Sequence, residues 1–600
     1  MKRRWDEPEL IFEQYRHGAG FKAAVGERGI CRQAAVNERF YVGDQWHGAR
    51  CGDQKPLVRY NVIKRIGDYK MAMVAGSSLA VNFSAEGVPS TAETKERLRV
   101  GRQALREGGT PALSEEDGLN LAMDALGDYF KTTAERVKLD QLKNTALRRA
   151  FTSGTGVLYT WWDPLIPTGL FADEGRTAPI TGDIRCEVLD VENVFFGDPH
   201  VDDVQAQPYI IIARREDVDA LRREAKRYRR PAEEIDRIRP DRDERPITDG
   251  GEELPDARKA TVLTKFYKQW NEDGTGWSIR AVRVVQGATV RGDWDLRVRL
   301  YPLAVFCWET RPHCAYGLSE VTHLVPNQIA INRAITASAN AVMMMGMPIM
   351  VVNEDVVAAP VTNDPGQIIP VNGGEDMGEC IRYVAPQNFT PQFDNLVNSM
   401  IANTLTQAGA NDAALGDMRP DNTSAIIAVR EAATMPMQLM QNRFYSFVED
   451  VARIWAEFWV TMYGKRPLRV RDEGGEWYIP FDGEACRRQI INVRVDVGPA
   501  NLWSEIQSRQ TLDNLFAAQL LTPLQYLERL PKGSVPDQTG LVREARQAAG
   551  MPPADGEEAA PPDPQQLVEL LPPESREAFH RLTPEQQQAV FARVPGLQKG

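Results

Sequence analysis

Apolar positions along the first half of the chain change from helical to strand spacing. Helical spacing predicts helices across residues 8–85 and a charged helical layer over residues 90–150. The period then shortens to two, so residues 157–162 and 183–189 are predicted to pair as antiparallel strands. Helices and antiparallel strands in one region predict an α+β fold that is mainly helical.

The next region contains further strands and one charged stretch. Residues 209–213 and 303–308 are predicted apolar strands, and residues 214–245 a heavily charged helical run. Strands at residues 261–270 and 277–285 flank a turn-rich connection, which predicts a hairpin.

Two helices separated by short strands are predicted after this region. The first helix opens at Gly317 and ends at Gly346, where Pro348 follows. Beyond it the pattern predicts three short strands and a second helix, at residues 349–352, 367–371, 381–384 and 392–407.

A loop over residues 408–422 precedes a predicted helix of about forty residues, which would extend roughly 60 Å. Thr423 or Ser424 can cap the start of this helix, and Gly464 is placed to end it. Pro436 removes one backbone hydrogen bond and predicts a kink.

The C-terminal part of the chain is predicted to be mixed. Strands are expected over residues 467–500, and residues 502–530 read as two helices split near Thr522 and Pro523. A Pro-rich linker follows at residues 551–564, and then a short helical tail.

Charge excludes one class of function. The formal net charge is −12, whereas a protein that grips nucleic acid needs an excess of Lys and Arg on its contact surface. Residues 319–424 hold eleven Asp or Glu, three Arg and no Lys, and no lysine occurs between Gln269 and Gly464. This stretch is typical of an element that stands beside copies of itself around a passage with a weakly acidic lining, and the charge does not exclude a protein through which DNA slides.

No motif for a cofactor or metal is found. The chain lacks a GxxxxGK phosphate loop, so we expect no ATP hydrolysis. The spacing of Cys307, His313, Cys314 and His323 does not fit a zinc module, and we predict that these residues bind no metal. We therefore expect no cofactor and no enzymatic activity.

The segment Ala334–Val352 is uncharged, and its length is close to that of a helix that spans a bilayer. Its polar residues and the hydrophilic chain around it favour a helix buried against other subunits, so no membrane partner is expected. The first ten residues lack the apolar core of a signal peptide, and secretion is not expected.

Two further patterns allow a functional and a structural interpretation. Trp455 and Trp459 could stack on bases, but their helical spacing favours the core. The strongest basic cluster could touch DNA or a scaffold protein, although a solvated helix face paired with Glu224, Glu233 and Glu234 is favoured. The cluster consists of Arg222, Arg223, Lys226, Arg227, Arg229 and Arg230.

Several short stretches, taken in order, resemble the portal or head-to-tail connector proteins of tailed bacteriophages, most closely those of short-tailed phages and prophages. The stretches are residues 40–46 (FYVGDQW), 301–303 (YPL), 316–320 (YGLSE), 326–333 (PNQIAINR), 363–366 (NDPG), 410–416 (ANDAALG), 422–426 (NTSAI) and 452–455 (ARIW). They extend over roughly residues 37–545.

The resemblance implies a dodecameric ring at one capsid vertex, with wing, stem, clip and crown regions around a central DNA channel. The implied boundaries are wing 1–316 and 425–500, stem helices 317–346 and 390–408, clip 347–389, tunnel loop 409–424, crown 501–550, and linker and tail 551–600. The implied location is the virion, after assembly in the host cytoplasm.

The resemblance also implies partners and sites. The partners are other copies of the chain, terminase, major capsid and scaffolding proteins, head-completion and tail adaptor proteins, and double-stranded DNA. Tunnel-loop residues expected at the channel are Asn411, Asp412, Asp417, Arg419, Asp421 and Asn422. Clip residues expected to face terminase or the tail are Glu354, Asp355, Asp364, Glu375, Asp376 and Glu379.

Two alternatives stay open at this point. Asp412, Asp417 and Asp421 would be the acids of a metal-dependent nuclease or terminase subunit, although three acids in one loop are more often turn formers. The second alternative is a monomeric adaptor.

Overall fold

The protein divides into two compact units. A computed structural model describes residues 6–46, 57–76, 79–86, 92–106, 114–171, 179–241, 258–271, 274, 276–346, 349–353, 355, 357, 368, 370–372, 381–384, 391–410, 435–472, 475–487, 489, 491–497, 512–518, 521–530, 540–542 and 545–546. Unit 1 is Met1–Val470 with Trp477–Gly498, and unit 2 is Arg471–Glu476 with Pro499–Gly600.

Helices and strands are interleaved along the chain, which confirms an α+β fold. The helices are α1 (Pro8–Ala24), α2 (Ile30–Val42), α3 (Val62–Ala75), α4 (Ala92–Arg106), α5 (Glu115–Val137), α6 (Leu139–Ser153), α7 (Val218–Arg227), α8 (Ala232–Arg237), α9 (Glu320–Gly346), α11 (Pro391–Gln407), α14 (Gln438–Met462), α15 (Gly483–Arg487) and α17 (Pro523–Arg529).

The strands form small antiparallel sheets. They are β1 (Leu79–Ala85), β2 (Thr155–Phe171), β3 (Pro179–Leu189), β4 (Val194–Phe196), β5 (Tyr209–Asp217), β6 (Lys259–Trp270), β7 (Trp277–Val285), β8 (Ala288–Asp295), β9 (Leu303–Cys307), β10 (Glu309–Arg311), β11 (Cys314–Leu318), β12 (Ile349–Val352), β13 (Ile381–Val384), β14 (Lys465–Asp472), β15 (Gly475–Asp482) and β16 (Ile491–Val497). The two larger sheets have the orders β4-β5-β6-β7-β8 and β3-β2-β9.

The five-stranded sheet is apolar on both faces. Ile211 on β5 packs with α1, while its neighbours Ile210 and Ile212 belong to the main core on the opposite face. The predicted hairpin between residues 261–270 and 277–285 is confirmed as β6 and β7, with Trp270 opposite Trp277.

The predicted helical run over residues 214–245 is wrong at its start. Strand β5 continues to Asp217 and pairs with β6, with Arg214 opposite Val262. The two short helices α7 and α8 follow it. High charge density misled the prediction, because these charged side chains lie on a half-buried strand rather than on a helix.

The three-stranded sheet confirms the predicted pairing of residues 157–162 with 183–189, since Leu158 lies opposite Val188. Helices were predicted throughout residues 8–85, and this is wrong for Leu79–Ala85, which forms β1. Its inward residues Val81 and Phe83 are buried, and its partner strand is β16. Such a distant partner leaves no local signal.

Helix α14 lies in the centre of unit 1. Trp455 and Trp459 are 0% exposed and meet edge to face, which confirms core packing. A 3₁₀ turn at Met435–Met437, which contains Pro436, precedes the helix, and Gly464 follows it with a positive φ of 58°. The predicted helix start at Thr423 or Ser424 lies outside the described residues.

A buried polar cluster ties α14 to the sheet beside it. Asp183 on β3 is 4% exposed and pairs with Arg136 at 2.7 Å. Tyr463 and Tyr129 also donate hydrogen bonds to this carboxylate, at 2.9 Å and 3.2 Å. Burial raises the pKa of both tyrosines, so they remain donors at neutral pH.

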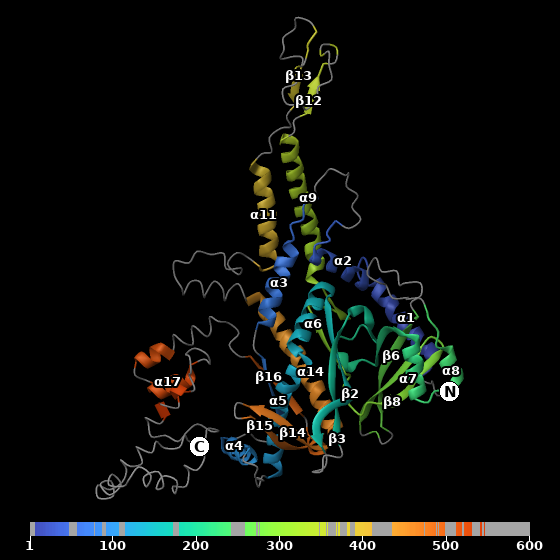
Figure 1. The fold of residues 1–600 in the computed structure, drawn as a ribbon, viewed down its shortest axis with the longest axis vertical. Coiled ribbons are helices and arrows are strands. Elements are labelled where there is room, and N and C mark those ends of the chain that lie inside the picture. The colour runs from blue at the N-terminus through green and yellow to red at the C-terminus, as the bar shows by residue number, and fades with distance from the viewer. Residues whose placement is uncertain are drawn as a thin grey trace, which may run out of the picture. The chain divides into compact units, whose positions relative to one another are not determined.

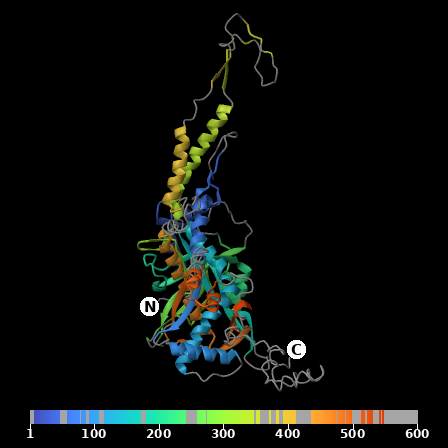
Figure 2. The same ribbon diagram turned by 90° about the vertical axis from the view of Figure 1, so that its left-hand side faces the viewer.

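Helices α9 and α11 lie side by side in both views (Figure 1, Figure 2). Asn327 near the start of α9 donates to Gln407 at the end of α11 at 3.4 Å, so the two helices run antiparallel. The hairpin β12–β13 lies between them in the chain. Two of the three predicted short strands are thus confirmed. The third, residues 367–371, contributes only one bridge within its described part, from Val371 to Val357.

Unit 2 contains the two predicted helices at residues 512–517 and Pro523–Arg529. Thr522 and Gln525 form a reciprocal capping box at the start of α17. Phe516 packs against Tyr526 with ring centroids 4.8 Å apart.

Lys22 on α1 is expected to make stability depend on pH. It is 1% exposed, its ammonium nitrogen lies 3.6 Å from the centroid of the Phe195 ring, and burial lowers its pKa to about 7. The unfolded chain, with the ordinary pKa of 10.5, binds more protons than the folded chain above pH 7. Lys22 should therefore contribute a rise in stability from pH 7 to about pH 10.5, and Lys22→Met should make the slope in this window less positive. Melting temperatures of both proteins across this window test the prediction, and equal slopes would contradict it.

Candidate channel segment and its anchor

The start of α9 is fixed to the body of unit 1 by polar contacts. Ser319 accepts a hydrogen bond from the backbone N–H two residues later at 3.1 Å and donates to the carbonyl of Phe151 at 2.6 Å. Glu320 accepts from the Trp308 indole at 3.0 Å and forms an ion pair with Lys70. These contacts cap the helix and fix its point of departure.

Farther along α9, three polar residues at four-residue spacing face the segment of residues 58–62, which leads into α3. We call Gln328, Asn332 and Thr336 the polar ladder. Their oxygens accept backbone N–H groups from Val62 at 3.0 Å, Tyr60 at 3.0 Å and Val58 at 3.1 Å, in that order. Gln328 also donates to the Tyr60 carbonyl at 2.6 Å.

The ladder follows one face of α9, along which four residues advance about 6.0 Å. Every second N–H of the segment meets every fourth side chain of α9. At its end the segment turns into α3, where the Val62 N–H also reaches the Tyr60 carbonyl at 3.0 Å. Gln328 and Asn332 are 1% and 2% exposed, so their own amide groups have protein partners in place of water.

The ladder brings together residues 40–46 and 326–333, two of the stretches on which the family resemblance depends. Asn332 donates to Gln45 at 2.5 Å, and the Trp46 indole donates to the carbonyl of Val58 at 3.1 Å. Gly43 ends α2 with a φ of 98°, which turns the chain towards α9. The sequence alone did not predict this contact, although amides at i and i+4 in a helix with few charges were a usable signal.

The surface of the helix pair has few charges. Glu320, Arg333 and Asp394 are the only Asp, Glu, Lys or Arg in α9 and α11. Large apolar side chains are nevertheless exposed on both helices: Val342 is 64% exposed, Met343 50% and Leu396 54%. A surface of this kind indicates contact with other chains.

Residues 172–566, more than half of the chain, match the model of the phage SU10 portal protein family. The chain belongs to this family. The match includes α9, the hairpin, α11 and α14, and it confirms the resemblance to bacteriophage portal proteins. A search of curated proteins finds no match. The prediction of a phage portal protein is thus confirmed, and portal proteins are a structural class of protein.

For this portal protein the predicted contact residues stay predictions. All six tunnel-loop residues lie outside the described residues, as do Glu354, Asp364, Glu375, Asp376 and Glu379 of the clip. Asp355 is described and exposed, and its backbone N–H donates to the side chain of Asn353 at 3.2 Å. It is therefore accessible to a partner.

The described part of the portal chain offers neither a metal site nor a membrane-spanning helix. There, no three His, Cys, Asp or Glu residues lie close enough to hold a metal ion. Cys307 instead contacts the carbonyl of Ala315 at 3.8 Å. Among the same residues, no helix combines the length and the apolar character needed to cross a bilayer.

Proposed function

We propose that copies of this portal protein close into a ring at one vertex of the phage head, with α9 and α11 lining a central channel for double-stranded DNA. One observation carries the proposal: an antiparallel helix pair with three charged residues and exposed apolar side chains. Neighbouring copies would cover these apolar side chains, and the absence of lysine keeps the wall from gripping phosphates.

The same proposal gives each end of the helix pair a role. The hairpin region between α9 and α11, residues 347–389, carries Asp355 and five further acids and is the proposed docking surface for terminase and later for tail adaptors. Terminase would supply the ATP-driven movement. The polar ladder would hold each α9 at a fixed inclination to its own subunit, so that copies present the same wall.

Electron microscopy of the negatively stained protein, combined with mass photometry, tests the ring. We expect hollow rings with a mass that is an integral multiple of the subunit mass of 67.2 kDa. A single species at the subunit mass, under conditions in which the chain is folded, would contradict the proposal in favour of a monomeric adaptor.

An assay for Mg²⁺-dependent DNA cleavage and for ATP turnover tests the enzymatic alternative. We expect neither activity. Robust cleavage that disappears in Asp412→Ala would support a nuclease and would overturn the proposal.

A further inference from the structure

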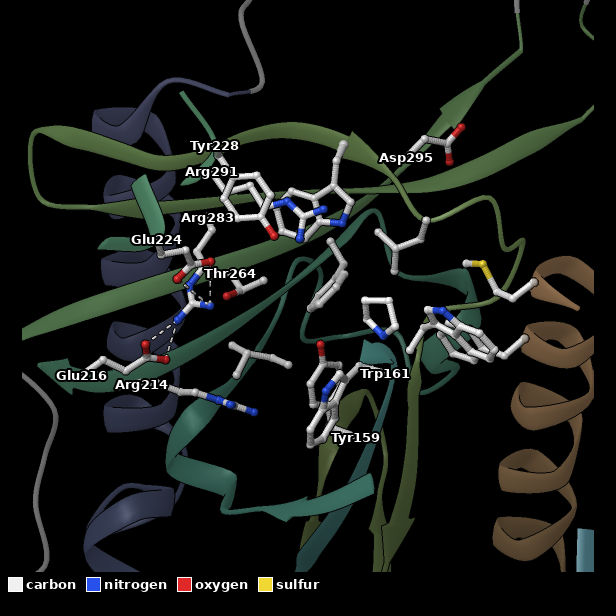
Figure 3. Close-up of a pocket in the computed structure, with 18 residues that line it drawn as sticks. Tyr159, Trp161, Arg214, Glu216, Glu224, Tyr228, Thr264, Arg283, Arg291 and Asp295 are labelled. Carbon is white, nitrogen blue, oxygen red and sulfur yellow. Dashed lines mark hydrogen bonds and ion pairs between the residues drawn. The ribbon is translucent and has the colours of Figure 1, made fainter. Parts of the chain in front are cut away.

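A recess of about 480 Å³ lies in the body of unit 1, between β2, strands β5–β8, α7 and α14 (Figure 3). Aromatic rings form much of its wall. Tyr159 and Trp161 stack with centroids 5.3 Å apart, and the rings of Phe266 and Phe458 are buried behind them. Such walls favour an apolar group.

Two of the three guanidinium groups that line the recess are neutralised by carboxylates. Arg283 contacts Glu216 at 2.5 Å and Glu224 at 3.3 Å (Figure 3). Arg214 forms an ion pair with Glu187. These two arginines face three glutamates, so one negative charge is left over, and Asp295 also lines the recess.

The third guanidinium, that of Arg291, is held by aromatic rings instead. Its central carbon lies 3.7 Å from the centroid of Trp294 and 4.4 Å from that of Tyr228. Within the described part of the chain, no carboxylate lies within ion-pair distance of it. Burial lowers the pKa of Arg291, while the charge of Glu224 acts in the opposite direction. A guanidinium that packs on rings keeps its in-plane N–H groups available for a carboxylate.

Positive charge continues around the mouth of the recess. Lys226, Arg227 and Arg229 are exposed beside Tyr228, and the charge of Arg227 acts on Arg291. The sequence analysis favoured a salt-bridged face for this cluster. In the structure Arg230 pairs with Glu234 at 2.6 Å, but Glu224 pairs with Arg283 and not with the cluster.

We propose that this recess binds an acidic peptide segment of a partner protein, with one carboxylate on Arg291 and an adjacent apolar side chain against the aromatic walls. The aromatic lining distinguishes a peptide from duplex DNA, because a duplex stacks its bases inside and presents only phosphates on a convex surface. This site does not depend on ring formation.

The test uses a fluorescein-labelled peptide, Gly-Glu-Phe-Glu-Glu-Gly, in anisotropy titrations with the full-length protein. We expect saturable binding that is lost when glutamine replaces each glutamate of the peptide. Arg291→Gln should weaken binding about tenfold, which corresponds to roughly 1.4 kcal/mol. Arg32→Gln, on the exposed face of α2, removes the same charge and should leave binding unchanged.

A second variant separates loss of binding from loss of folding. Tyr228 is 37% exposed, so Tyr228→Ala should fold normally while releasing the Arg291 side chain, and it should also weaken binding. Melting curves of every variant check the fold. The proposal is overturned if the unchanged protein does not bind the peptide, if Arg291→Gln binds as well as the unchanged protein does, or if a DNA duplex of about twenty base pairs competes more strongly than the unlabelled peptide at physiological salt.

Discussion

A Val342→Asp substitution is expected to convert rings of this portal protein into folded monomers. Val342 lies on α9 and is 64% exposed in the single chain, so the change should leave the subunit fold intact. In a ring the new carboxylate would be buried against a neighbour without a partner, and burying an unpaired charge costs several kcal/mol. Every subunit interface carries the defect, so the effect multiplies around the ring. Mass photometry and negative-stain images measure the loss.

Leu396→Asp on α11, where Leu396 is 54% exposed, should have the same effect. The matched control is Val100→Asp on α4. Val100 is 55% exposed, and α4 is far from α9 and α11 both along the sequence and within unit 1. This control should still form rings. Intact rings in both Val342→Asp and Leu396→Asp would show that these helices do not form the contact between copies.

The second large effect is expected from Asn332→Leu in the polar ladder. Leucine has a similar size but leaves the Tyr60 N–H without its acceptor and the Gln45 side-chain oxygen without its donor, beside a side chain that is 2% exposed in the unchanged protein. Each orphaned buried polar group costs about 1–3 kcal/mol. We therefore expect the free energy of local opening at this contact to fall by about 3 kcal/mol. Backbone hydrogen exchange at Tyr60 should become about a hundredfold faster.

Asn327→Leu, on the same helix, is the matched control. Asn327 makes one long hydrogen bond of 3.4 Å near the surface, so its loss should change stability by about 0.5 kcal/mol or less. Hydrogen exchange at Val58, Tyr60 and Val62 should stay slow in this variant. If both asparagine variants behave alike, the ladder does not anchor α9.

Local pattern was sufficient to predict many elements. Alternation placed the hairpin of β6 and β7, and a turn-rich connection between them fixed which strands pair. The helical spacing of apolar residues, in segments with few charges, predicted α9 and α11. Gly346 ended α9 as expected. The stripe containing Trp455 and Trp459 correctly predicted a buried helix, because a period of 3.6 places its apolar residues on one face.

Charge density was a poorer guide. Residues 214–217 are rich in charge and were predicted to begin a helix, yet they extend β5. Arg214 and Glu216 alternate with their neighbours along this strand and enter the recess. There the hydrogen bonds that β6 offers outweigh the helix propensity of these residues. These bonds depend on the tertiary structure, which no short stretch of sequence reveals.

The sequence by itself determined much of the order of helices and strands, the near absence of charge on α9 and α11, and the stretches by which the chain belongs to its family. Only the tertiary structure decided which distant segments meet: Leu79 with Val497, residues 58–62 with the ladder on α9, and Arg291 with Tyr228. Periodicity reports which face of an element is buried. It does not report the partner, because a partner is selected when both surfaces bury apolar area and satisfy each other's hydrogen bonds, often hundreds of residues apart.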